Sequence, residues 1–132
     1  MKPCVVYFSR TGNTKFMAQA IADAVKAPLF DIALAEPSVV VDYDMLIFGT
    51  PVEGARPAKE ALAWVDRLPK AEGKKSILFC TYKLWVAGTF KNLSEVLKSK
   101  GYAVALEVQK RNVKQGKTDF SDVQEKVKKA LS

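Results

Sequence analysis

The feature that most constrains the fold of this chain is a regular alternation of short apolar runs with segments of helical periodicity. Five runs have the length and composition of buried strands, at residues 5–8, 29–32, 45–48, 76–80 and 102–108. Between them, apolar spacing predicts helices over residues 14–25, 57–68, 90–100 and 120–131, and one short helical turn within 36–43. The runs are continuously apolar, which is typical of parallel strands covered on both faces.

This alternation predicts an α/β fold, a doubly wound parallel sheet with right-handed crossovers. A chain of 132 residues can build one hydrophobic core, so we predict a single domain over residues 1–132. No apolar run approaches the ~20 residues of a membrane span. The first residues lead directly into the first strand, and no signal peptide is expected. We therefore predict a cytoplasmic protein without a membrane span.

The turn after the first strand is suited to hold an anion. Its residues are Ser9, Arg10, Thr11, Gly12, Asn13 and Thr14. The first N–H groups of the helix that follows have no intrahelical acceptor, and the helix dipole favours negative charge there. Three hydroxyls can donate to the same anion, and Gly12 allows the backbone to approach it closely. The alternative is an ordinary polar turn with an N-cap.

This turn resembles the phosphate loop of the flavodoxin family, through the pattern Ser9-x-Thr11-Gly12-x-Thr14 directly after an apolar N-terminal strand. In that family the loop holds the 5′-phosphate of FMN without a cationic side chain. The resemblance implies a flavodoxin-like, five-stranded parallel sheet in the order 2-1-3-4-5, for which flavodoxin is itself the standard example. It also places the ligand beyond the C-terminal strand ends, so the loops after the third and fourth strands should matter.

Two later segments resemble the flavin loops of the same family. Residues 49–57 begin Gly-Thr-Pro and contain a further glycine, and residues 81–89 contain the spacing Tyr-x-x-Trp-x-x-Gly. The resemblance implies FMN contacts from Thr50, Pro51, Val52, Glu53, Gly54, Thr81, Tyr82, Lys83, Trp85 and Gly88. A flavin ring needs aromatic or aliphatic faces and polar backbone groups at its edge. Tyr82 and Trp85 can offer ring faces, although packing aromatics are the alternative.

The family also implies a peptide, here Glu53–Gly54, that reorients to bond N5 of the one-electron-reduced flavin. Gly54 would tolerate either orientation. The loop lacks the aromatic residue that many flavodoxins have, so one flavin face is expected to be covered by aliphatic groups or left open.

Charge separates this chain from typical flavodoxins, which are acidic. The formal net charge is +7, and residues 91–132 hold ten Lys or Arg against five Asp or Glu. Arg56 and Lys83 lie in the predicted flavin loops, and positive charge near the flavin stabilises its anionic reduced form. We therefore predict a less negative second reduction potential than acidic flavodoxins show. The excess charge also favours acidic partners, although a solvated lysine-rich surface is the alternative.

Other chemistries find little support in the sequence. The chain has no His, and Cys4 and Cys80 both lie in apolar strands, so we predict buried thiols and no metal site. Cys4 and Arg10 have the spacing of a phosphatase loop, but an extended strand holds them about 20 Å apart. The motif of P-loop NTPases, G-x-x-x-x-G-K-[ST], and the motif of dinucleotide-binding folds, G-x-G-x-x-G, are both absent from the sequence. Glu53 is the only carboxylate in a flavin loop, so no catalytic residue is predicted.

The resemblance implies an FMN-binding, flavodoxin-like electron-transfer protein that exchanges electrons with redox partner proteins. Two alternatives stay open: an FMN-dependent reductase of quinone-type acceptors, and a flavodoxin-like domain that has lost flavin binding. Basic charge without a recognition motif predicts no specific nucleic-acid partner. The basic stretch 109–117 is predicted to be an exposed loop.

Overall fold

The apolar runs form one mainly parallel sheet in the computed structural model, which describes residues 2–132. Its strands are β1 (Pro3–Tyr7), β2 (Leu29–Asp31), β3 (Met45–Glu53), β5 (Lys74–Tyr82) and β6 (Tyr102–Arg111), with a two-residue strand β4 (Arg56–Pro57). The order is β2-β1-β3-β5-β6, and β4 pairs with the end of β3 in the antiparallel sense. The predicted order 2-1-3-4-5 of the parallel strands is therefore confirmed.

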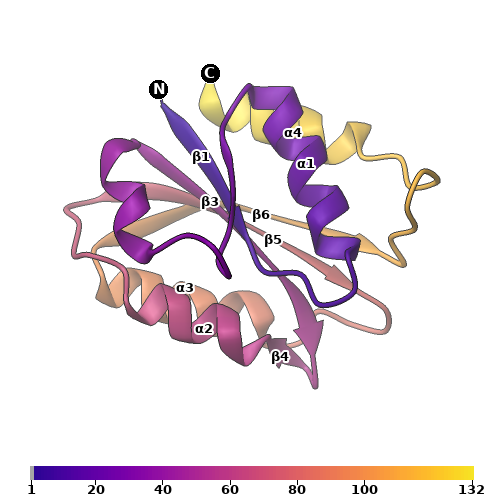
Figure 1. Cartoon of the computed structure of the whole chain (residues 1–132), viewed down its shortest axis with the longest axis horizontal. Helices are drawn as coiled ribbons and strands as arrows, with labels where there is room; N and C mark the ends of the chain where they lie inside the picture. The colour runs from indigo at the N-terminus through magenta and orange to yellow at the C-terminus, as the bar shows by residue number, and fades with distance from the viewer. Residues whose placement is uncertain (1) are drawn as a thin grey trace.

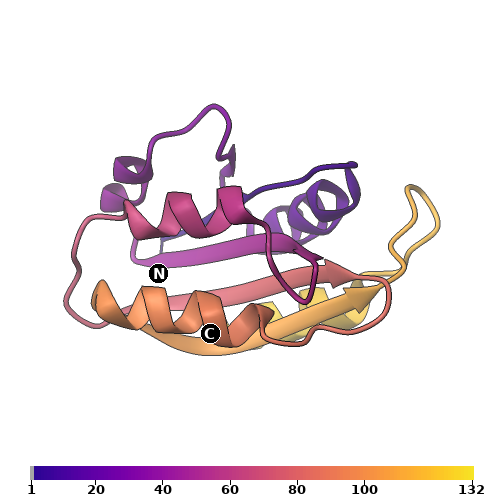
Figure 2. The same cartoon turned by 90° about the horizontal axis from the view of Figure 1, so that it is seen from below.

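Helices cover both faces of the sheet (Figures 1 and 2). They are α1 (Asn13–Val25), α2 (Lys59–Asp66), α3 (Thr89–Ser99) and α4 (Ser121–Leu131), with a 3₁₀ helix η1 (Pro37–Asp42) between β2 and β3. Helices α1 and α4 lie on one face, and α2 and α3 lie on the other. This arrangement explains why the strands are apolar on both sides. Within residues 2–132, every helix is too short or too polar to span a bilayer.

Each face of the sheet has its own apolar core. On the α2–α3 side, Trp64 stacks on Phe48 with ring centroids 5.7 Å apart. On the α1–α4 side, Met17, Ile21 and Val127 pack against fully buried strand residues. Between these two cores the strands β2, β1, β3, β5 and β6 pair in parallel, so their carboxyl ends lie at one edge of the sheet.

The two cysteines are buried core residues, as predicted. Cys4 lies in β1 and Cys80 in β5, each with no exposed surface. Burial raises the pKa of both thiols to about 12. Neither thiol is therefore a nucleophile near neutral pH, and the phosphatase spacing has no chemical counterpart in the structure.

Several predicted loops are partly strand. β3 continues to Glu53 and β5 to Tyr82, because residues 50 and 51 pair with residues 80 and 81. Pro57 lies in β4 rather than in a helix, and α2 begins at Lys59. β6 continues to Arg111, so only part of the stretch 109–117 is loop. Neighbouring strands supply the hydrogen-bond partners that extend these strands, and no local pattern reveals them.

Candidate functional site

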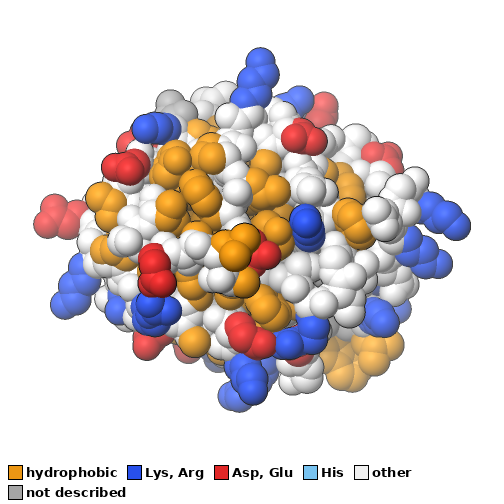
Figure 3. All heavy atoms as spheres, viewed as in Figure 1, with side chains coloured by type: hydrophobic (Ala, Val, Ile, Leu, Met, Phe, Trp, Pro, Cys, Tyr) orange, Lys and Arg blue, Asp and Glu red, His pale blue; other side chains and the backbone are white. Residues whose placement is uncertain are grey.

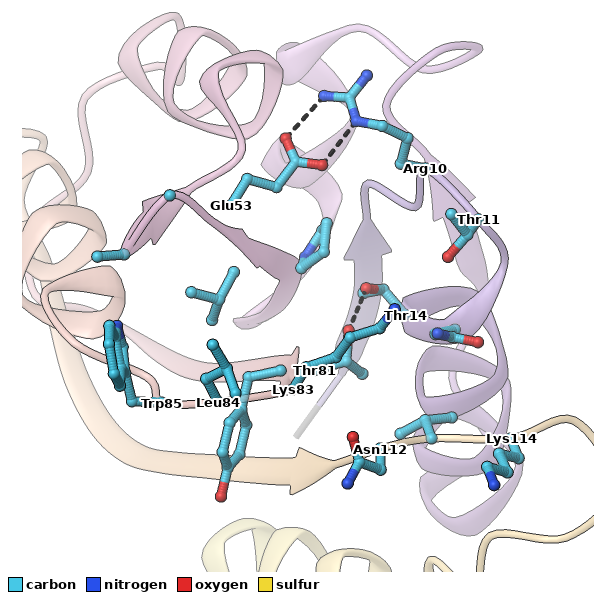
Figure 4. Close-up of a pocket in the computed structure, with 17 residues that line it drawn as sticks. Arg10, Thr11, Thr14, Glu53, Thr81, Lys83, Leu84, Trp85, Asn112 and Lys114 are labelled. Atoms are coloured by element: carbon cyan, nitrogen blue, oxygen red, sulfur yellow. Dashed lines mark hydrogen bonds and ion pairs between the residues drawn. The ribbon is translucent and has the colours of Figure 1, made fainter.

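A cavity of about 650 Å³ lies at the carboxyl ends of the parallel strands (Figure 4). Four segments line it, within residues 10–14, 51–55, 81–85 and 112–114. They follow or end β1, β3, β5 and β6. This is the edge at which open α/β sheets bind ligands. The three segments expected from the sequence therefore meet at one cavity.

The turn after β1 presents amides to this cavity. Gly12 has φ 99°, a left-handed conformation that allows the chain to enter α1. The Ser9 hydroxyl accepts hydrogen bonds from the N–H groups of Gly12 and Lys15, at 3.0 and 3.2 Å. Within residues 2–132, the amides of Thr11, Asn13 and Thr14 have no protein acceptor. An anion in the cavity can therefore accept hydrogen bonds from them.

A buried hydroxyl pair joins this turn to the end of β5. Thr14 Oγ1 and Thr81 Oγ1 lie 2.7 Å apart, and the two residues are 1% and 5% exposed. Figure 4 shows the pair between the first turn of α1 and the strand end. Each hydroxyl has further hydrogen-bonding capacity beyond this contact. The pair therefore sets the relative position of two lining segments.

Arg10 points toward the β3–β4 hairpin (Figure 4). Its Nε and Nη2 donate to the two carboxylate oxygens of Glu53, at 2.6 and 2.8 Å, and Nη2 also donates to Glu60 at 2.9 Å. Hydrogen bonding to these carboxylates raises the pKa of Arg10, and the same contact lowers the pKa of Glu60. Because the guanidinium already donates to the hairpin and to α2, the backbone amides and hydroxyls of the turn are its main hydrogen-bond donors for an anion.

The hairpin turn between β3 and β4 has an unusual backbone. Gly54 and Ala55 have φ of 58° and 66°, as in the two-residue turns that match strand twist. The Ala55 carbonyl accepts a hydrogen bond from the Gly88 N–H at 3.2 Å. Thr50, fully buried, accepts a hydrogen bond from the Ala58 N–H at 3.1 Å. These contacts fix the hairpin against the start of α2 and the loop before α3.

Two large apolar side chains border the cavity without a protein cover. Leu84 is 71% exposed and Trp85 is 62% exposed. In Figure 4 they lie across the cavity from Thr11 and Thr14. The Lys83 carbonyl accepts a hydrogen bond from Arg111 Nε at 2.9 Å, which holds this loop against the end of β6. A flat apolar ligand would remove part of this surface from water.

The comparisons with known proteins agree with this geometry. A family model described as the flavodoxin domain matches residues 4–131. The chain belongs to the flavodoxin family. Membership implies FMN as the cofactor.

Three individual proteins are similar to this chain. A flavodoxin of Megasphaera elsdenii is 35% identical over 92 residues, which are 64% of this chain and 66% of that protein. The uncharacterized protein MJ0298 of Methanocaldococcus jannaschii is 29% identical over 107 residues, 79% of this chain and 71% of that protein. The solved flavodoxin of Streptococcus pneumonia TIGR4 has a TM-score of 0.80 at 18% identity, covering 99% of this chain and 98% of its own, which shows the shared fold.

The residues of this flavodoxin-family chain fit FMN. The cavity of about 650 Å³ lies within the ~300–1,000 Å³ typical of small-molecule sites. One end offers amides without protein acceptors, beside hydroxyls, and the other end offers the exposed Trp85 ring. These donors and surfaces correspond to a phosphate and an aromatic ring.

Most of the predicted flavodoxin-type site residues line the cavity, and four do not. Those that line it are Arg10, Thr11, Asn13, Thr14, Pro51, Val52, Glu53, Gly54, Thr81, Tyr82, Lys83 and Trp85. Ser9, Gly12, Thr50 and Gly88 lie behind it and hold the backbone of the lining segments. Of the two predicted basic groups, Lys83 lines the cavity and Arg56 does not.

Residues 112–114 form a fourth lining segment, which was not predicted from the sequence. Asn112 has φ 51° and donates its N–H to the Tyr82 carbonyl at 2.9 Å. This hydrogen bond holds the segment that follows β6 against the end of β5. A usable signal was present, because the loop after the fifth parallel strand must open at the same edge as the others. Ala55 and Leu84 also line the cavity and were not predicted to do so.

Proposed function

We propose that this chain binds FMN in the cavity and carries single electrons between redox partner proteins. The amides of Thr11, Asn13 and Thr14 and the hydroxyls of Thr11 and Thr14 would hold the phosphate. The hairpin 51–55 and the segment 82–85 would hold the ring. The observation that carries the proposal is the pairing of an anion-suited turn with an exposed Trp85 ring across one cavity.

The protein's part in this function is binding, positioning and exclusion of water. Bound FMN supplies one- and two-electron redox chemistry. The hydroxyls of Thr11 and Thr14 would donate to the phosphate, and the rings of Tyr82 and Trp85 would offer faces to the flavin. The Glu53–Gly54 peptide offers polar groups to the flavin edge. Lys83 places positive charge at the cavity and favours the anionic reduced form.

The pairing of the one carboxylate in the described cavity lining supports a carrier over a substrate-specific enzyme. Glu53 is the carboxylate that lines the cavity, and both its oxygens accept hydrogen bonds from Arg10. The redox partners are proteins, and the net charge of +7 favours partners with an acidic surface.

The test begins with the absorption spectrum of the purified protein and a titration of the apoprotein with FMN. Binding is expected to quench FMN fluorescence with a 1:1 endpoint, whereas riboflavin, which lacks the phosphate, should bind more weakly. The reduced holoprotein should then transfer electrons faster to a one-electron protein acceptor than to a quinone. A colourless protein that binds no FMN, or a faster reaction with quinones, would contradict the proposal.

A further inference from the structure

The rim of the cavity is strongly basic on one side. The segments 83–91 and 109–118 together contain six Lys or Arg residues and no Asp or Glu. They lie side by side, because Arg111 donates to the Lys83 carbonyl and Asn112 donates to the Tyr82 carbonyl. We call Lys83, Arg111, Lys114 and Lys117 the basic rim. All four residues are exposed, so their charges face solvent.

Most of this charge is not neutralised within the chain. Lys110 forms an ion pair with Asp122 at 2.8 Å. Among residues 2–132, no carboxylate forms an ion pair with any member of the basic rim. Figure 2 shows the β6–α4 connection, which carries Lys114 and Lys117, projecting beyond the end of the sheet. Figure 3 shows Lys and Arg side chains along the same end of the molecule.

The opposite side of the cavity has a different charge pattern. There Arg10 is shared by Glu53 and Glu60, so positive and negative side chains are mixed on that side. The exposed Leu84 and Trp85 belong to the basic side, next to Lys83. The basic side therefore combines an apolar centre with a charged surround, which is the composition of protein interfaces.

We propose that the basic rim, together with Leu84 and Trp85, is the docking surface for an acidic patch of the redox partner. The proposal rests on the proposed electron-carrier function and names the partner's surface chemistry and its orientation. In the productive complex, bound FMN would accept one electron that the partner's reduced centre loses. No atom is transferred between the two proteins.

The physical role expected of the rim is to steer association. Complementary charges raise the association rate by about 10- to 1,000-fold, and salt reduces the effect. Rim charges act mainly on the association rate, whereas the apolar centre acts on dissociation. An acidic partner is thus guided to the edge at which Trp85 borders the cavity.

The probe for the test is an acidic plant-type [2Fe–2S] ferredoxin, immobilised for binding measurements and, in a second assay, used as reductant of the FMN-loaded protein. Wild-type protein should bind at 20 mM salt and lose most of this affinity at 300 mM. The double substitution Lys114→Glu/Lys117→Glu should lower the association rate at 20 mM salt about tenfold. Lys117→Glu alone, outside the cavity lining, should give an intermediate loss.

The matched control is Lys70→Glu/Lys126→Glu, which makes the same change in net charge at exposed sites away from the cavity. It should bind the ferredoxin within about twofold of wild type. FMN affinity and circular dichroism are measured for each variant, so that loss of cofactor or fold is distinguished from loss of docking. Binding of the apoprotein to the ferredoxin is also measured, since it tests the surface even where FMN binding fails.

Three results would overturn the proposal. One is an equal decrease of the association rate in the control variant, which would show that only the net charge of the protein matters. The second is no salt-dependent binding to the ferredoxin. The third is tighter binding of a single-stranded oligonucleotide through the same two lysines, which would make the rim a nucleic-acid surface.

Discussion

The two ends of the cavity are built differently. At one end, Thr14 in the turn after β1 and Thr81 at the end of β5 are buried and form a 2.7 Å hydroxyl contact, so these two segments are held together before any ligand arrives. At the other end, Leu84 and Trp85 are 71% and 62% exposed. The fold therefore preorganises the end of the cavity at the turn after β1, whereas the end at Trp85 would gain its packing from a ligand or a partner.

Backbone conformation shows the same contrast. Four non-glycine residues have positive φ in the part of the chain that the structure describes, and three of them, Ala55, Ala87 and Asn112, lie in loops at the aromatic end. Such conformations cost of order 1–3 kcal/mol each and persist where surrounding contacts hold them. They place the carbonyl of Ala55 and the N–H of Asn112 in hydrogen bonds that join these loops to their neighbours.

The largest expected effect is at the anion end. Thr14→Val removes a hydroxyl from the turn and leaves the buried Thr81 hydroxyl without its partner. A hydrogen bond to a charged group contributes about 1.5–3 kcal/mol, so the FMN dissociation constant should rise about 10- to 100-fold. Riboflavin affinity, measured by the same fluorescence titration, should change by only about twofold. Equal losses for both ligands would place the phosphate elsewhere.

The aromatic end should respond differently. Trp85→Leu keeps an apolar side chain but removes the ring face. Aromatic stacking contributes about 0.5–1.5 kcal/mol beyond the buried area, so both FMN and riboflavin should bind about 2- to 10-fold more weakly. Isothermal titration calorimetry with the two ligands measures this. A loss confined to FMN would show that Trp85 acts at the phosphate and would remove the contrast between the two ends.

A smaller effect is expected on the redox potential. Lys83→Gln removes a positive charge from the cavity lining and should make the second reduction step more negative by roughly 20–60 mV. Arg56→Gln is the matched control, because Arg56 is exposed and lies outside the lining, and it should shift the potential less. Spectroelectrochemical titration gives both values. A larger shift from Arg56 would contradict the placement of Lys83.

The smallest effect is expected on the stability of the fold, through the ion pairs of Arg10. Arg10→Met should lower Tm only slightly at pH 7, because exposed ion pairs stabilise folded proteins little. The Arg10 contact lowers the pKa of Glu60, so its contribution is present above the ordinary value of 4.5 and is lost as pH falls through the lowered pKa. The Tm difference between the two proteins should therefore shrink at pH 3. Arg67→Met, which breaks a more exposed pair with Glu36, is the control.

Much of the site could be predicted because its segments are local in sequence. The turn 9–14 is a strand end, a glycine and a helix start within a few residues, and its pattern identifies it without any distant contact. The order of the parallel strands followed from the alternation of strands and helices together with the family resemblance, and the structure confirms it. The buried cysteines likewise followed from the strands that contain them.

The pattern of apolar runs and turns was sufficient to predict the α/β architecture and the edge of the sheet at which the polar and aromatic loops come together. Which side chains meet at that edge depends on how the chain folds. Arg10, in the turn after β1, binds carboxylates 43 and 50 residues away. Residues 112–114 reach the cavity because β6 pairs with β5 as far as Arg111. These outcomes depend on partners distant in sequence, which local propensity and spacing do not encode.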